Sequence, residues 1–442
     1  MDFCVKTLVT VGVALMLICG AATNGAMQSE PGSRQAAAAS QQAQNQQAYH
    51  LPPDKLAKAI VLNRIRAFLD IGGSIWGVVV LWLLLATRAA ARLEAWVGRV
   101  VRGRWRQGLV FFTALLVTVT VASFPLDVVG HAASLHYHIS VEGWGSWLLD
   151  NAKALGLSLV VGVPVLLLFN RIVRVSPRRY WLWGWVIAVP LMLLSTFVEP
   201  LMEPIFYKFE PLSEHYPKLV TELEKVVAKT GTNIPPDRMY LMLASEKTNG
   251  LNAYVSGIGA TKRIVVWDTT AGRIPDNEIL FVFGHESGHY VLHHIQKSLV
   301  ITSIALFFVF WVCAGVAAWL LRRFGARWGV ESLGGRAGFV VILLVLSAAG
   351  FLLQPAGNAV SRYFEHQADV YGQEAIHGIV SDPQKTAVAA FNALGESGLD
   401  DPNPNAFVVF WTYSHPPIEQ RAEFAEHYDP WRNGGHGRYF KN

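Results

Sequence analysis

The run His285-Glu286-Ser287-Gly288-His289 is followed closely by a charge-free apolar stretch, Ser298–Leu321, that is long enough to cross a bilayer. We expect one helix over Asn277–Gln296, with Asp276 as its N-cap. Residues four apart share one face of a helix, so His285 and His289 can bind one zinc ion. Glu286 can then reach a zinc-bound water as general base. The stretch predicts a zinc hydrolase site beside a membrane span.

A third ligand is needed, because catalytic zinc usually has three protein ligands and an open position. Glu365 is the best candidate, since it follows the apolar stretch Ala337–Ser361 that returns after Ser298–Leu321. An antiparallel hairpin brings the two ends together at one membrane face. The rival, His366, points about 100° away from Glu365 on a helix. Asp369 lies one turn further and can hold a histidine ligand through its other ring nitrogen.

Two more histidines, His293 and His294, follow the motif closely. Histidines beside a metal-binding motif are more often ordinary polar residues than ligands. We therefore expect both to be polar positions near the membrane surface rather than ligands.

The composition indicates a membrane protein, because 52% of the 442 residues are hydrophobic and only 16% are charged. Soluble domains carry nearer a quarter charged residues. Charge-free apolar stretches that reach or approach a membrane span lie at Thr7–Ala26, Ile71–Thr87, Gly108–Leu126, Ala154–Asn170, Tyr180–Val198, Ser298–Leu321 and Ala337–Ser361. We therefore predict an α-helical polytopic protein of the lipid bilayer with about seven transmembrane helices. The arginines lie in short loops between these stretches, so we expect no nucleic-acid partner.

The polar regions are expected to form an α+β, zincin-like catalytic region. Helical spacing over Pro217–Lys229 is followed by β-rich runs at Met239–Leu243, Asn252–Gly257 and Arg263–Trp267. The predicted parts of the chain are a signal peptide or first transmembrane helix (1–26), a disordered Gln/Ala-rich linker (27–50), an N-terminal membrane domain (51–203), a catalytic region with the motif helix (204–297), a transmembrane hairpin (298–361) and a C-terminal catalytic region with the third ligand (362–442).

Loop charges predict an orientation. Arginines are concentrated in the loops Arg88–Arg106, Arg171–Arg179 and Arg322–Arg336, whereas the loop Asp127–Lys153 has no arginine and a single lysine. Positively charged loops stay in the cytoplasm. Both polar regions then face outward, which in a bacterium means the periplasmic side of the inner membrane.

With these residues identified, the chain resembles the type I CAAX prenyl endopeptidases, membrane gluzincins that also include the HtpX-like quality-control proteases. The resemblance covers nearly everything from His50 onward, with five spans before the motif and two after it. The matching segments are Pro204-Ile-Phe-Tyr-Lys-Phe-Glu-Pro-Leu212, Asn252-Ala253-Tyr254, the H-E-S-G-H run, Asn358 with Arg362-x-x-Glu365-x-x-x-Asp369, and Ser414-His415-Pro416-Pro417 with Arg421.

The resemblance implies roles for these residues. It implies one zinc ion on His285, His289 and Glu365, with Glu286 as base. It also implies His415 as a donor to the tetrahedral oxyanion and places Arg362, Asp369 and Arg421 around the ligands. The strand at Asn252, Ala253 and Tyr254 would pair with substrate backbone as an added strand. Because eukaryotic members work on the cytosolic face, the resemblance favours a cytoplasmic catalytic side.

The sequence thus predicts a membrane zinc metalloendopeptidase acting on peptide or protein substrates that are prenylated or membrane-associated. One alternative is an HtpX-like protease that clears misfolded membrane proteins. A non-enzymatic alternative is a zinc-dependent peptide-binding or transport protein of the membrane. The intact H-E-x-x-H of His285–His289 argues against that last alternative.

Overall fold

The computed structural model describes residues 47–257 and 259–441, and six of its helices are long and apolar enough to cross a membrane. Each contains one of the predicted stretches after the first, which confirms those six predictions; the stretch Thr7–Ala26 and most of the linker lie outside the described residues. The six helical segments are α3 (Pro53–Ala86), α5 (Arg104–His136), α6 to α7 with a π-turn between them (Trp144–Val175), α8 (Tyr180–Met202), α13 (His294–Trp328) and α14 (Arg336–Ile376).

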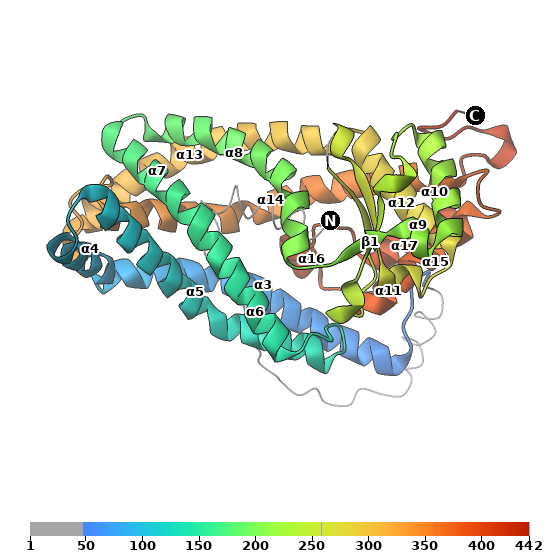
Figure 1. Cartoon of the computed structure of the whole chain (residues 1–442), viewed down its shortest axis with the longest axis horizontal. Coiled ribbons are helices and arrows are strands. Elements are labelled where there is room, and N and C mark those ends of the chain that lie inside the picture. The colour runs from blue at the N-terminus through green and yellow to red at the C-terminus, as the bar shows by residue number, and fades with distance from the viewer. Residues whose placement is uncertain (1–46, 258, 442) are drawn as a thin grey trace.

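These long helices run along the long axis of the molecule, and the strands and shorter helices gather at one end (Figure 1). The short helix α4 (Ala89–Val100) lies at the other end, where the arginine-rich loops meet. There Arg88 donates to the carbonyl of Arg327, and Glu94 accepts from the backbone N–H groups of Arg336 and Ala337. The basic loops are therefore at the end opposite the sheet.

The predicted loop Asp127–Lys153 is mostly helical. Helix α5 continues to His136 and α6 begins at Trp144, so only residues 137–143 connect them. The apolar run predicts where a helix crosses the bilayer, but not how far it continues beyond. Here the connection is fixed by the catalytic region, because Ser140 forms a β-bridge with Thr248.

A four-stranded sheet has the order β1-β2-β4-β3, with β2 and β4 parallel and the other pairs antiparallel. The three predicted strands are confirmed as β2 (Met239–Met242), β3 (Ala253–Ser256) and β4 (Arg263–Trp267). The sequence prediction missed β1 (Phe209–Pro211), which is too short to show alternation. The strand β3 is at an edge of this sheet, and its position places it against the motif helix.

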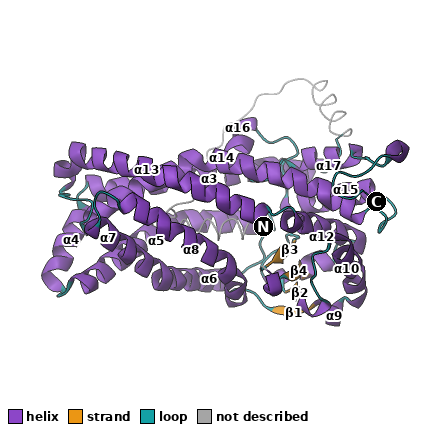
Figure 2. Cartoon of the chain, turned by 90° about the horizontal axis from the view of Figure 1, so that it is seen from above, coloured by secondary structure: helices purple, strands orange, loops and turns teal. Residues whose placement is uncertain are grey.

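The sheet and its helices share one hydrophobic core, which includes Leu241, Val266, Leu223, Ile279 and Phe391. The strands supply alternate residues to this core, whereas the helices supply one face each. The shorter helices at this end are α9 (Leu212–His215), α10 (Pro217–Thr230), α11 (Asp268–Ala271), α12 (Asp276–Val291), α15 (Pro383–Gly398) and α17 (Ile418–His427). Figure 2 shows α9, α10 and α12 near the strands, whereas α16 (Ala406–Thr412) packs on α14 and α3.

The predicted single helix over Asn277–Gln296 is wrong at its end. Helix α12 ends at Val291, and α13 begins at His294 after His293, whose φ of 57° is left-handed. The predicted N-cap is wrong as well, because Asp276 is the first helical residue and Pro275 precedes it. Pro275 restricts the backbone just before the helix. The negative charge of Asp276, in the first turn, interacts favourably with the positive N-terminal end of the helix dipole.

Candidate metal centre

Helices α12 and α14 approach each other closely because glycines face one another where they cross. A Cβ on Gly372 would lie 2.8 Å from the backbone nitrogen of His285, and one on Gly284 would lie 3.0 Å from the carbonyl oxygen of Gly372. Only residues without a side chain permit this spacing. The crossing therefore brings the side chains of the motif helix within reach of those on the returning membrane helix.

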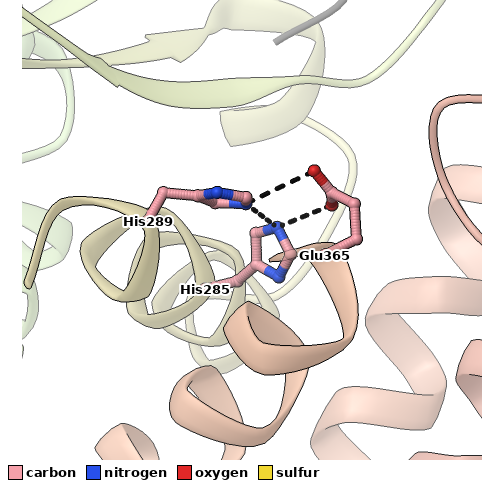
Figure 3. Close-up of side chains that lie close together, drawn as sticks. All are labelled: His285, His289 and Glu365. Atoms are coloured by element: carbon pink, nitrogen blue, oxygen red, sulfur yellow. Dashed lines mark hydrogen bonds and ion pairs between the residues drawn. The ribbon is translucent and has the colours of Figure 1, made fainter. Parts of the chain in front are cut away.

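Three predicted ligands meet at this crossing (Figure 3). His285 Nε2 lies 3.1 Å from His289 Nε2 and 3.3 Å from Glu365 Oε2, and His289 Nε2 lies 3.4 Å from Glu365 Oε1. Ligand atoms on one tetrahedral zinc ion, each about 2.0–2.2 Å from it, are roughly 3.3–3.5 Å apart. The triangle therefore has the size that a metal ion requires.

The environment of Glu365 also favours a cation. The residue is 0% exposed, and among the described residues no group donates a hydrogen bond of good geometry to either of its carboxylate oxygens. A buried carboxylate without donors is costly unless a cation balances it. Two imidazole nitrogens and a carboxylate are a donor set that suits zinc. The residues present thus fit a resident metal ion.

A carboxylate and a guanidinium lie behind His285. Asp369 Oδ1 is 2.9 Å from His285 Nδ1, on the side of the ring away from the triangle. Arg421 donates to both oxygens of Asp369. Burial lowers the pKa of His285, but the hydrogen bonds and charges of Asp369 and Glu365 outweigh it and raise the pKa to about 9. The arrangement orients the ring so that Nε2 faces the metal position.

His294, expected as a polar position near the membrane surface, is buried against a predicted ligand. It is 3% exposed, and its Nδ1 lies 3.2 Å from Nδ1 of His289. The sequence did not predict this contact, because the expected helix was unbroken, whereas the left-handed His293 turns the chain back. His293 itself is exposed.

The remaining predicted residues lie around this centre. Glu286 is half-buried. Burial lowers the pKa of Arg421, but Asp369, and to a lesser extent Glu365 and Glu286, outweigh it and raise that pKa. His415, between α16 and α17, has its Nε2 3.3 Å from Glu365 Oε2. Arg362 donates to the carbonyls of Val409 and Tyr413, just before His415. It therefore orders the segment that presents His415.

The predicted substrate strand lies on β3, which packs against α12. The backbone groups of Asn252 are already hydrogen-bonded within the fold. Its carbonyl accepts from Trp267 N–H, and its N–H donates to Thr270 Oγ1. Hydrogen-bonded pairs alternate in an antiparallel ladder, so the backbones of Ala253 and Val255 face the open edge. The sequence prediction named Ala253; the register adds Val255 as a second residue whose backbone faces the same edge.

Comparisons with known proteins agree with this arrangement. Residues 214–429 match the model of peptidase family M48, and residues 34–208 match the model described as CAAX prenyl protease N-terminal, five membrane helices. An uncharacterized metalloprotease YhfN of Bacillus subtilis is 33% identical over 379 residues, which is 85% of this chain and 86% of the relative.

More distant similarity extends to eukaryotic proteins. A CAAX prenyl protease 1 homolog of Homo sapiens is 26% identical over 321 residues, covering 63% of this chain and 65% of the relative. The crystal structure of S. mikatae Ste24p superposes with a TM-score of 0.64 at 22% identity and covers 75% of this chain and 79% of that one. This last likeness supports the fold.

Proposed function

Since this chain belongs to peptidase family M48 and is a multi-pass membrane metalloprotease, we propose that its metal is a single zinc ion held by His285, His289 and Glu365. The observation that carries the proposal is the triangle of side-chain atoms with edges of 3.1, 3.3 and 3.4 Å. Its size and its donor types suit tetrahedral zinc.

The proposed chemistry is hydrolysis of an internal peptide bond. When bound, zinc polarises the scissile carbonyl and makes water acidic enough to be deprotonated near neutral pH. Glu286 follows the first ligand on α12 and is half-buried beside the centre. Its carboxylate takes the proton from the attacking water and delivers it to the leaving amine.

His415 is the proposed donor to the oxyanion. Its Nε2 lies 3.3 Å from Glu365 Oε2, while its Nδ1 is 2.9 Å from Ser414 Oγ. A fixed donor stabilises the charge that develops in the transition state. Arg421 and Asp369 orient His285, and Arg362 orders the segment before His415.

The substrate is proposed to bind as an extended strand on the open edge of β3. The outward backbone groups of Ala253 and Val255 supply the hydrogen bonds, and α12 lies beneath this strand. Main-chain pairing gives affinity for any extended peptide, whereas side-chain pockets give specificity. This mode suits an endopeptidase.

We propose prenylated or membrane-associated peptides as the substrate class. The support is the match to the five-helix CAAX prenyl protease N-terminal model and the relatives named CAAX prenyl protease 1. In a direct test, the purified protein is incubated with a farnesylated CAAX peptide, the same peptide without lipid, and casein. Selective cleavage of the first, stopped by a chelator and restored by zinc, supports the proposal. Equal cleavage of all three favours the HtpX-like alternative.

We propose a bacterial inner-membrane location with the catalytic end in the periplasm. The basic loops gather around α4, at the end away from the sheet, and positive residues stay cytoplasmic. A reporter fused after Asn442 tests this orientation: periplasmic activity supports it, and cytoplasmic activity supports the orientation of the eukaryotic relatives. We also propose that the chain divides into parts at 51–203, 204–297, 298–361 and 362–442.

A further inference from the structure

We propose that His294 is a positioning residue that fixes the orientation and tautomer of His289, through a neutral chain that ends at Gln367. The proposal rests on the zinc site described above. His289 Nδ1 is 3.2 Å from His294 Nδ1, and His294 Nε2 is 3.0 Å from Gln367 Oε1. Both nitrogens of His294 are thus occupied by partners, so it supports a ligand instead of serving as one.

The backbone is built to place His294 there. Five residues along an unbroken helix, His294 would lie about 140° away from His289 around the axis. Instead α12 ends at Val291, and His293 adopts a left-handed φ of 57°, which is uncommon for a residue other than glycine. Helix α13 then starts at His294 itself, and the imidazole points back toward the metal centre.

Packing holds the ring in place from the other side. The His294 ring stacks on Phe364 with a centroid distance of 4.5 Å and an interplanar angle of 13°. Phe364 precedes the ligand Glu365 on α14, and Gln367 follows that ligand by two residues. The side chains that hold His294 therefore flank the third ligand, and all three zinc ligands are connected through one packed unit.

One assignment of protons satisfies both hydrogen bonds of the series His289–His294–Gln367. A metal on Nε2 of His289 leaves the proton on Nδ1, which must donate. Nδ1 of His294 then accepts, so its proton is on Nε2, and this N–H donates to the carbonyl oxygen of Gln367. The chain contains no charged group and ends on an amide.

The two histidine ligands are therefore supported differently. His285 is backed by the carboxylate of Asp369, which Arg421 neutralises, whereas His289 is backed by a neutral imidazole and an amide. Outer partners of this kind typically change metal affinity by about 10–100-fold when they are removed. The same loss is expected here from removing His294, although it touches neither the metal position nor the substrate strand.

The test compares His294→Phe with His294→Asn. Phenylalanine keeps the buried ring on Phe364 but removes both hydrogen bonds, whereas asparagine retains an acceptor. Dissociation of zinc to a chelator is expected to be about 10–100-fold faster in His294→Phe and to return partly in His294→Asn. The visible spectrum of the cobalt(II)-loaded protein is expected to shift in His294→Phe, and kcat is expected to fall with KM nearly unchanged.

Controls separate this proposal from the proposed function. His293→Asn changes the exposed neighbour to a residue that tolerates the left-handed backbone, and it should leave zinc release and the cobalt spectrum unchanged. Gln367→Met removes the last acceptor of the hydrogen-bond series from His289 through His294. It should reproduce part of the effect, even if His294→Phe does not fold. Suppose that the parent protein binds zinc and is active, but the His294→Phe and Gln367→Met variants release zinc at the parent rate. That result would overturn this inference and leave the proposed function intact. A parent that binds no zinc would overturn the proposed function.

Discussion

Arg421 binds Asp369 at two points, with Nε 2.9 Å from Oδ2 and Nη2 2.6 Å from Oδ1. Both side chains are nearly buried, and Asp369 also faces Nδ1 of His285. The pair thus links the C-terminal part of the chain to the first proposed zinc ligand. A charge-assisted, two-point contact of this kind fixes geometry more strongly than a single hydrogen bond.

We first predict that Asp369→Asn weakens zinc binding by about 10–100-fold, because His285 loses its charged outer partner. It should also destabilise the protein by about 3–5 kcal/mol, since the guanidinium of Arg421 is left buried without its counter-charge. Chelator competition and thermal unfolding in detergent measure the two effects. The double variant Asp369→Asn with Arg421→Gln should recover part of the stability but not the zinc affinity; recovery of both would contradict the role of Asp369.

Glu286→Gln should lower kcat by at least about 10²–10⁴-fold, because the amide cannot accept the proton from water. Bound zinc should remain at the parent level, since Glu286 is not one of the three converging ligands. The measurements are metal content and cleavage of a fluorogenic peptide. Glu365→Gln is the matched comparison and should lose zinc as well as activity. Retained proteolysis in Glu286→Gln would refute the mechanism.

Gly372→Ala should separate α12 from α14. The added Cβ would lie 2.8 Å from the backbone nitrogen of His285, so one helix must shift. We expect a loss of stability of about 1–3 kcal/mol and weaker zinc binding, because Glu365 moves away from the two histidines. Gly357→Ala on the same helix is the control, since nothing lies within 4 Å of its added Cβ. Similar effects at both positions would show that the close crossing is unimportant.

Glu374→Gln should release the segment after Gly437. The buried carboxylate accepts from the backbone N–H groups of Arg438, Tyr439 and Phe440, at 2.6, 2.7 and 3.0 Å, and from the hydroxyl of Tyr428. Each hydrogen bond to a charged group contributes about 1.5–3 kcal/mol. A lower unfolding temperature and faster tryptic cleavage at Arg438 are expected.

The control for that experiment is Glu396→Gln. Glu396 pairs with Lys55 at the surface, where both side chains are about half exposed, at 51% and 41%. Exposed ion pairs contribute about 0–1 kcal/mol. An equal change in unfolding temperature for the two variants would show that the buried carboxylate of Glu374 has no special role.

The amino-acid sequence by itself determined the membrane spans, the motif helix and most of the sheet. Hydropathy and periodicity depend on residues that are close in the chain, so Ser298–Leu321 and Arg263–Trp267 could be assigned before any contact was known. The position of Glu365 near His285 and His289 was also predictable, because the length of two membrane spans fixes where a hairpin returns.

The tertiary structure decided what local patterns do not contain. A glycine often marks a left-handed turn in a sequence, but the turn here is at His293. The contact of His294 with His289 was therefore not predictable. Likewise the outward register of Val255 depends on its partner strand, and the spacing of α12 from α14 depends on Gly284 meeting Gly372. The sequence specified the ligand types, whereas long-range packing set how each ligand is held, because hydrogen bonds between distant segments exist only once those segments are in contact.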